Sequence, residues 1–132
     1  MVAGCHIKPE QFFNLIFGYN DTLHDKKTVT STGTSATMDS SAVPAGEIWI
    51  VRQVSGGSGS RQATLLDCQI YEAATTLHGL GAVQPVGTSW TLCRETEVIL
   101  KATDQIRGIF YGVANGDSVS MTIHGYKMKV SQ

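Results

Sequence analysis

Hydrophobic and polar residues alternate along much of the chain after residue 43, a pattern typical of β-strands. The clearest case is residues 118–130, where Val119, Met121 and Ile123 alternate with polar positions. Short β-branched and apolar runs predict further strands. Together these patterns predict strands over residues 47–54, 63–71, 88–94, 97–102, 106–113 and 118–130.

Turn-forming residues separate these segments. Pro44 and Gly46 precede the first strand, and Asn115-Gly116 between two strand patterns predicts a hairpin, because both residues tolerate positive φ. Residues 56–60 are rich in Gly and Ser and predict a flexible turn. Residues 73–87 contain Gly79, Gly81 and Pro85 and predict a long irregular connection.

The first 42 residues have a different pattern. Apolar residues at positions 12, 15, 16 and 19 lie on one face of a helix, which would begin near Pro9 and end near Gly18. So short a helix is unstable alone, and it would dock on its own domain or on a neighbouring subunit. Residues 28–38 predict a weak strand. We therefore expect an N-terminal arm over residues 1–42 and a β-sandwich domain over residues 43–132.

The expected fold is all-β: a β-sandwich of seven or eight short antiparallel strands, with an N-terminal arm that contains a short helix. A jelly roll is one form of such a sandwich, and a small closed barrel is the alternative. The length of 132 residues indicates one domain. Charged residues make up only 16%, while Ser and Thr together number 25 and Gly 14, as in a β-protein with short turns.

The charge balance argues against two classes of partner. Ten Lys and Arg residues face eleven Asp and Glu, for a formal net charge of −1. Electrostatic nucleic-acid binders and polybasic membrane-surface domains carry a basic excess, so we expect neither partner. The apolar run at residues 12–17 is too short to span a bilayer and makes a poor signal peptide.

The sequence contains no recognisable catalytic motif. The three cysteines are widely spaced, and Cys68 and Cys93 are expected as small buried hydrophobes in a reducing compartment. The four histidines are scattered, and His124 lies on the polar face of a strand. A metal site of Cys68, His78 and Cys93, as in a cupin-like enzyme, is a minor alternative. We expect no enzyme activity, catalytic residue, metal or cofactor.

The acidic residues have ordinary structural interpretations. Glu95 and Glu97 would face the same side of a strand and are expected to form a solvated face rather than an acid–base pair. Asp104 and Asp117 occupy turn positions, where a carboxylate commonly accepts backbone N–H groups, and this is favoured over calcium binding.

Two stretches carry a resemblance to a known group of proteins. The first is Val43-Pro44-Ala45-Gly46-Glu47-Ile48-Trp49-Ile50-Val51. The second runs from Asp104 to Gly112 and continues through residues 115–119 to His124-Gly125-Tyr126. With these motifs the sequence resembles the small β-sandwich structural proteins of tailed-bacteriophage virions, although Thr103-Asp104 stands where Gly-Asp is more usual.

The resemblance implies a structural role in a virion. The protein would be synthesised in the host cytoplasm and located in the virion. The expected function is capsid decoration (cement), which stabilises the shell through multivalent contacts. A neck or tail component is one alternative and a carbohydrate- or receptor-binding module another, since Trp90, Tyr111 and Tyr126 could form an aromatic platform. The implied partners are the major capsid protein or other virion proteins, with a homo-oligomer, most often a trimer.

The residues expected to make such contacts are apolar ones without an obvious core period. The first choice is the arm segment, and the second is the connection over residues 75–87 together with Trp90. Trp49 lies within a hydrophobic run and is expected in the core. The candidate interaction residues are Phe12, Phe13, Leu15, Ile16, Phe17, Leu77, Leu80 and Trp90.

Overall fold

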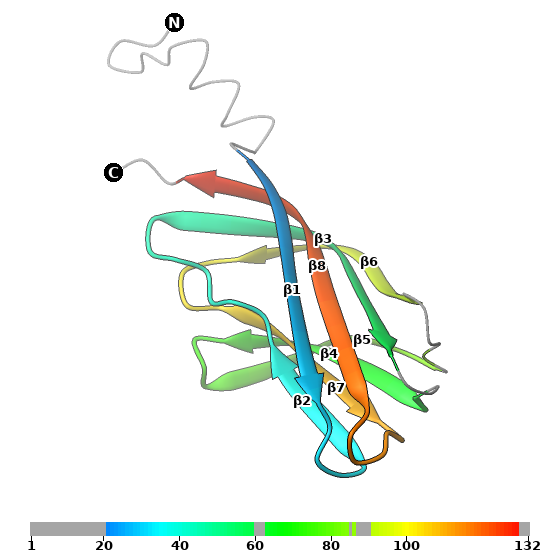
Figure 1. Cartoon of the computed structure of the whole chain (residues 1–132). Coiled ribbons are helices and arrows are strands. Elements are labelled where there is room, and N and C mark those ends of the chain that lie inside the picture. Colours follow the sequence, from blue (N-terminus) through cyan, green and yellow to red (C-terminus); the bar gives the residue numbers. More distant parts are fainter. Residues whose placement is uncertain (1–20, 60–62, 85, 87–90, 130–132) are drawn as a thin grey trace, which may run out of the picture.

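The computed structural model describes residues 21–59, 63–84, 86 and 91–129, and within residues 91–94 it describes the backbone only. These residues form eight antiparallel strands in two packed sheets (Figure 1). The strands are β1 (Asp21–Thr30), β2 (Ser35–Asp39), β3 (Glu47–Ser58), β4 (Leu65–Glu72), β5 (Thr76–Val83), β6 (Thr91–Leu100), β7 (Gln105–Tyr111) and β8 (Ser118–Lys129). The predicted all-β sandwich is confirmed.

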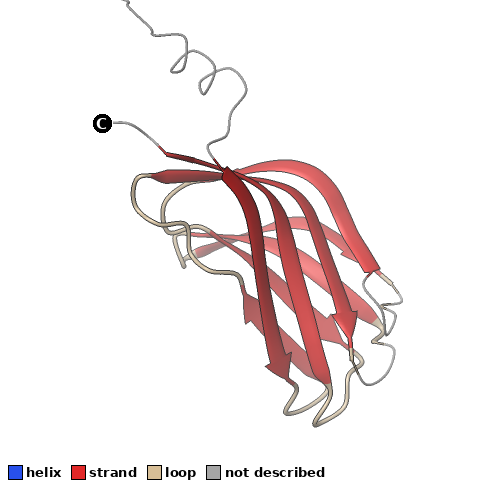
Figure 2. Cartoon of the chain, turned by 45° about the horizontal axis from the view of Figure 1, so that its top comes forward, coloured by secondary structure: helices blue, strands red, loops and turns tan. Residues whose placement is uncertain are grey.

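The strand order is that of a jelly roll. One sheet has the order β1-β8-β3-β6 and the other β2-β7-β4-β5. β1 pairs with β8, β2 with β7, β3 with β6 and β4 with β5, so the chain doubles back as one long antiparallel ribbon. The ribbon then curls so that β3 meets β8 and β4 meets β7. Two four-stranded layers result (Figure 2), as in double-sheet jelly rolls.

The core lies between the two sheets and receives alternate residues from most strands. Leu66, Phe110 and Met121 are almost completely buried there. Two glycines make room for them: a Cβ on Gly56 would lie 2.5 Å from Leu66 Cδ2, and one on Gly108 would lie 2.6 Å from Met121 Sδ. Each large apolar side chain buried in this way contributes about 1.5–3 kcal/mol to the free energy of folding.

The N-terminal part differs from the expected boundary at residue 42. β1 and β2 lie within residues 21–39, and each is an edge strand of one of the two sheets. The alternation in β1 is hard to recognise, because its inward positions include Asp25 and Lys27 as well as Leu23. The predicted helix and the contact residues Phe12 to Phe17 lie outside the described residues.

Two predicted loops are strands. Residues 76–83 form β5, whose glycines are accommodated at an edge by a register shift between Cys68 and Gln69 of β4. Residues 56–58 continue β3, because a glycine is required where Leu66 and Phe110 press against the backbone.

Two further connections differ from the prediction. Residues 91–94 and 97–100, from two segments predicted as separate strands, belong to one strand, β6, which has an irregularity opposite Arg52. Asn115-Gly116 forms a turn with positive φ at Gly116, but the turn passes from β7 in one sheet to β8 in the other. The turn was recognised correctly, whereas the hairpin pairing was wrong, because local turn chemistry does not specify the partner strand.

Several residue predictions are confirmed. Trp49 is buried, and its Nε1–H donates to Glu47 Oε1 at 3.0 Å. Cys68 is fully buried, while the side chain of Cys93 lies outside the described part. Asp104 accepts the N–H groups of Lys101 and Ala73 at 3.1 Å each, and Asp117 accepts that of Ala114 at 2.8 Å. Both carboxylates therefore support turns.

Candidate functional site

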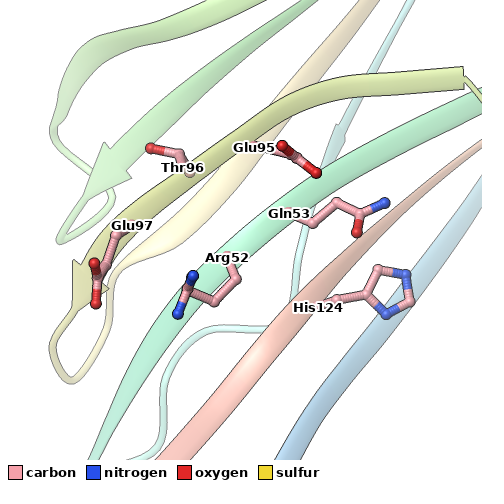
Figure 3. Close-up of a pocket in the computed structure, with 6 residues that line it drawn as sticks. All are labelled: Arg52, Gln53, Glu95, Thr96, Glu97 and His124. Carbon is pink, nitrogen blue, oxygen red and sulfur yellow. The ribbon is translucent and has the colours of Figure 1, made fainter.

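A row of polar side chains crosses the outer face of the sheet β1-β8-β3-β6. His24 of β1 pairs with His124 of β8, His124 with Gln53 of β3, and Gln53 with Glu95 of β6. Each residue is the lateral neighbour of the next, so one line runs over all four strands (Figure 3 shows the last three). Directly opposed side chains in a sheet lie about 5 Å apart, close enough to interact.

A β-bulge shapes this row. β3 has Val51 opposite Gly125 and Gln53 opposite His124, so Arg52 is an extra residue with no partner in β8. Both Arg52 and Gln53 then line the outer surface between the inward-facing Val51 and Val54. A bulge re-aims side chains in this way.

Gly125 allows the bulge to form. A Cβ at this position would collide with the carbonyl group of Ile50 and lie 3.1 Å from the Arg52 nitrogen. The backbones of β3 and β8 therefore approach each other where no other residue fits.

The bulge borders a shallow cavity of about 500 Å³. Arg52 lies across from Glu95 and Glu97 of β6, and Arg52 Nη1 donates to the Tyr126 hydroxyl at 3.1 Å. The cavity is lined by Arg52, Gln53, Glu95, Thr96, Glu97 and His124. Glu95 and Glu97 are exposed, as the sequence predicted, and they share this surface with the guanidinium group of Arg52.

The two histidines at the end of the row are in direct contact. The Nδ1 atoms of His24 and His124 are 2.7 Å apart, and the rings meet edge-on at 75°. A contact of this length between ring nitrogens requires a shared proton, so at least one ring is neutral. Burial, followed by the charge of His24, lowers the pKa of His124 below 6.5.

An apolar patch lies on the same face, toward the end of the sheet where β1 begins. Ile48 and Ile50 point outward because Trp49 and Val51 between them are buried. The pairing places Met128 opposite Ile48, with Tyr126 and Ile99 on either side of Ile50. Ile99 is 68% exposed. We call Ile48, Ile50, Ile99, Tyr126 and Met128 the outer apolar patch.

A second cluster lies where the edges of the two sheets meet. Glu72 contacts His78 Nε2 at 2.7 Å and Lys101 Nζ at 3.6 Å, beside a cavity of about 290 Å³. The hydrogen bond to His78, followed by the charge of Lys101, lowers the pKa of Glu72. Opposite charges are paired here, so the cluster is an ion-pair network on the surface.

On the outer face of the other sheet, a half-buried arginine is paired with a carboxylate on the neighbouring strand. Arg107 of β7 binds Asp39 of β2 through two hydrogen bonds of 2.7 and 3.0 Å. The same guanidinium lies 3.9 Å from the centre of the Tyr71 ring on β4. This arrangement fixes three neighbouring strands together.

Of the predicted contact residues, Leu77 and Leu80 lie in the part of the chain that the structure describes. Leu77 is 47% exposed on β5, whereas Leu80 is half-buried against the core. Trp90 lies outside the described residues. Tyr111 is on β7 and Tyr126 on β8, in different sheets, so they do not form the single platform that was considered.

The residues that build the candidate site were mostly missed. No strand was predicted at His24. Strands were predicted at Arg52 and Ile99, but their outer face was not recognised as an interaction surface. Their only sequence signal is an outward register beside buried neighbours such as Leu23 and Leu100.

Within the described ranges, no group of three or more His, Cys, Asp or Glu residues is arranged to hold a metal ion. Cys68 and His78, two residues of the alternative metal site, therefore do not belong to such a group. The side chain of Cys93, the third residue, lies outside the described part. No helix among these residues is long and apolar enough to cross a membrane.

Comparisons with known proteins find a likeness among solved structures. No protein-family model matches the chain, and no curated protein matches it. A crystal structure of the Drosophila NLP core, described in terms of pentamer formation and histone binding, matches with a TM-score of 0.42 and 14% identity. The match covers 81% of this chain and 99% of that chain.

The comparisons do not support the function expected from the sequence resemblance, because the solved structure they find is described as an NLP core and not as a virion protein. The expected capsid-decoration function, with its neck, tail and receptor-binding alternatives, is corrected here and is not proposed for this chain. A likeness at this level of identity does not transfer histone binding to the chain either.

Proposed function

We propose that the protein is a non-catalytic structural module that associates with further copies of itself through the outer apolar patch. The observation that carries the proposal is the exposure of Ile99, 68%, beside the outward-facing Ile50 on a neighbouring strand. Isolated surface hydrophobes are common, but a contiguous group on one sheet face is typical of an interaction surface.

The two edges of the sheet that carries the outer apolar patch are poorly suited to pairing with another chain. β1 is the edge strand at one side of this sheet and carries Lys26 and Lys27. β6, at the other side, carries Glu95 and Glu97 and has register irregularities against β3. Charges and bulges protect edges from strand addition, which leaves the face as the surface for association.

The occupant is a second copy, and its N-terminal segment supplies the apolar contacts. Residues 12–19 have the helical apolar spacing described above, and the chain enters β1 at Asp21, opposite Lys127 of β8. That entry point adjoins the row of Thr22, Tyr126 and Ile50 in the patch. Five side chains alone offer less than the roughly 1,200 Å² of a stable interface, so face and segment together are needed.

The test compares two substitutions that each replace an exposed aliphatic side chain by a lysine, one on each of the two sheets. Ile99→Lys should convert the oligomer to monomer, because burying a lysine in an apolar contact is costly. Leu77→Lys, on the other sheet, should leave the mass unchanged. Light scattering after size exclusion of the full chain gives the mass of each variant.

Two outcomes would overturn the proposal. A full-length protein that remains monomeric at about 100 μM excludes stable self-association. Dissociation by Leu77→Lys but not by Ile99→Lys would place the interface on the opposite sheet. Thermal denaturation of each variant controls for loss of the fold.

A further inference from the structure

We infer that His24 and His124 form a binding site for a divalent transition-metal ion on the outer face of the first sheet. The two imidazoles are cross-strand partners in a regular stretch of the β1–β8 pairing, so the backbone holds them side by side. Their Nδ1 atoms, 2.7 Å apart, converge on a single point. This inference is independent of the proposed self-association.

The geometry is close to what a metal ion needs. A metal–imidazole bond is about 2.0–2.1 Å long, so two cis nitrogen ligands lie about 2.9–3.4 Å apart in square-planar or tetrahedral coordination. A separation of 2.7 Å between the nitrogen atoms reaches this range through small side-chain rotations. The edge-on arrangement of the rings, at 75°, keeps their carbon atoms from colliding.

Protonation also favours a metal at this position. The contact between the rings already excludes two protonated imidazoles, and neutral imidazole is the form that binds metals. A bound ion would replace the single proton that the two nitrogens share. Thus the site would bind metal at neutral pH and release it in acid, where protons compete with the metal for imidazole nitrogen.

The surroundings leave room for the remaining ligands. His24 is exposed, His124 is half-buried, and the cavity of about 500 Å³ opens beside His124. Since the described residues contain no third ligand, water completes the coordination. Imidazole ligands with open positions select copper(II), nickel(II) or zinc(II) over magnesium or calcium, with copper bound most tightly.

The experiment uses the untagged full chain and titration calorimetry with copper(II) and zinc(II) chloride at about pH 7.5, where free imidazole is neutral. The chain has four histidines, which allows a matched pair of double variants. His6→Gln/His78→Gln retains only the proposed pair, and His24→Gln/His124→Gln retains only the other two. Any contribution from the cysteines is the same in both.

The expected result is one metal ion per chain for the wild type and for His6→Gln/His78→Gln. The double variant His24→Gln/His124→Gln should lose this binding. Each single substitution in the pair should weaken it by at least about tenfold, since even outer-shell partners of metal ligands contribute that much. Wild-type binding should also raise the Tm as metal concentration increases, and EDTA should reverse the rise.

Three results would overturn the inference. The first is no copper binding by the wild type at millimolar concentration, which would leave only a hydrogen bond between the rings. The second is equal binding by both double variants, and the third is binding that does not weaken at about pH 5, below the pKa of imidazole. Circular dichroism of every variant confirms that the fold is retained.

Discussion

At the residue scale, Gly125 has a larger effect on the surface than its lack of a side chain suggests. It lets the β3 backbone bulge at Arg52, and the bulge brings both Arg52 and Gln53 to the outer face. Without the bulge, Arg52 alone would take the outward position opposite His124, and Gln53 would turn inward. The shape of the polar surface therefore depends on one close contact between two backbones.

This contact predicts the effect of adding a single methyl group. Gly125→Ala should lower the free energy of unfolding by about 1–3 kcal/mol, because the new Cβ would collide with the backbone of Ile50, which cannot rotate away. Gly33→Ala is the matched control, since a Cβ there has nothing within 4 Å, and it should change stability by less than about 0.5 kcal/mol. Urea denaturation measures both. Equal stability of the two variants would contradict the close approach.

The histidine pair predicts a dependence of stability on pH. The pKa of His124 in the folded chain is lowered from 6.5 by burial and by the charge of His24. Between this lowered pKa and the unfolded value of 6.5, the unfolded chain therefore binds more protons than the folded one. This contribution to stability is complete above pH 6.5 and is lost as the pH falls through the lowered value. The Tm, measured with EDTA present, should decline over this range.

His124→Gln removes the titrating group and should make the Tm profile flatter on the acid side. His6→Gln serves as the control, because it also removes one histidine but lies outside the eight strands. A profile for His124→Gln that matches the wild type throughout would show that the pair does not sense pH.

Sequence reasoning at this scale identified half of the pair. His124 was placed on the polar face of its strand, because Val119, Met121 and Ile123 define the inward face. Its partner His24 lies 100 residues away in the chain. No local pattern states which strands become neighbours, so the contact could not be predicted.

At the scale of the strands, Arg107 joins three neighbours in the second sheet. Its guanidinium binds both oxygens of Asp39 on β2 and lies over Tyr71 on β4. Lysine cannot reproduce a planar, two-bond contact of this kind. The charge alone is therefore not what stabilises the arrangement.

Arg107→Lys should lower the free energy of unfolding by about 1 kcal/mol, a typical value for a partly buried bidentate pair. Lys101→Ala is the control, because its ammonium lies 3.6 Å from Glu72 and its side chain is 69% exposed. That substitution should cause no measurable change, as is usual for exposed ion pairs. Guanidinium denaturation compares them, and an unaffected Arg107→Lys variant would contradict the assigned role.

The success of strand prediction followed hydrophobic contrast. β8 was recognised because its apolar residues alternate cleanly, β3 because it is rich in Ile and Val, and β7 because it contains Ile106, Ile109 and Phe110. β5 was missed because Gly79 and Gly81 are typical of loops, and its burial is mostly low. Most of β1 was missed, with only residues 28–30 inside the predicted weak strand 28–38, because charged residues occupy both faces of β1, which an edge strand tolerates.

At the scale of the whole molecule, self-association should depend on the segment before β1. Deleting residues 1–20 should leave the sandwich folded, because all eight strands begin at Asp21 or later. The same deletion should abolish association, since it removes the apolar residues 12–19 of the proposed contact. Sedimentation velocity gives the mass, and far-ultraviolet circular dichroism reports the fold.

A truncated protein that still associates would exclude the segment from the interface. A monomeric full chain whose truncated form binds more of a hydrophobic dye would instead mean that the segment covers the patch of its own chain. Either result would contradict the exchange of segments between copies, while leaving the jelly-roll fold unaffected.

The pairing of β1 with β8 also has a mechanical consequence. Asp21 lies opposite Lys127, so the first and last strands enter and leave the sandwich at the same end (Figure 1). A force that pulls these two ends apart acts on the ladder of hydrogen bonds one rung at a time, as in opening a zipper. The protein should therefore unfold at low force when stretched between its ends, however stable it is to heat.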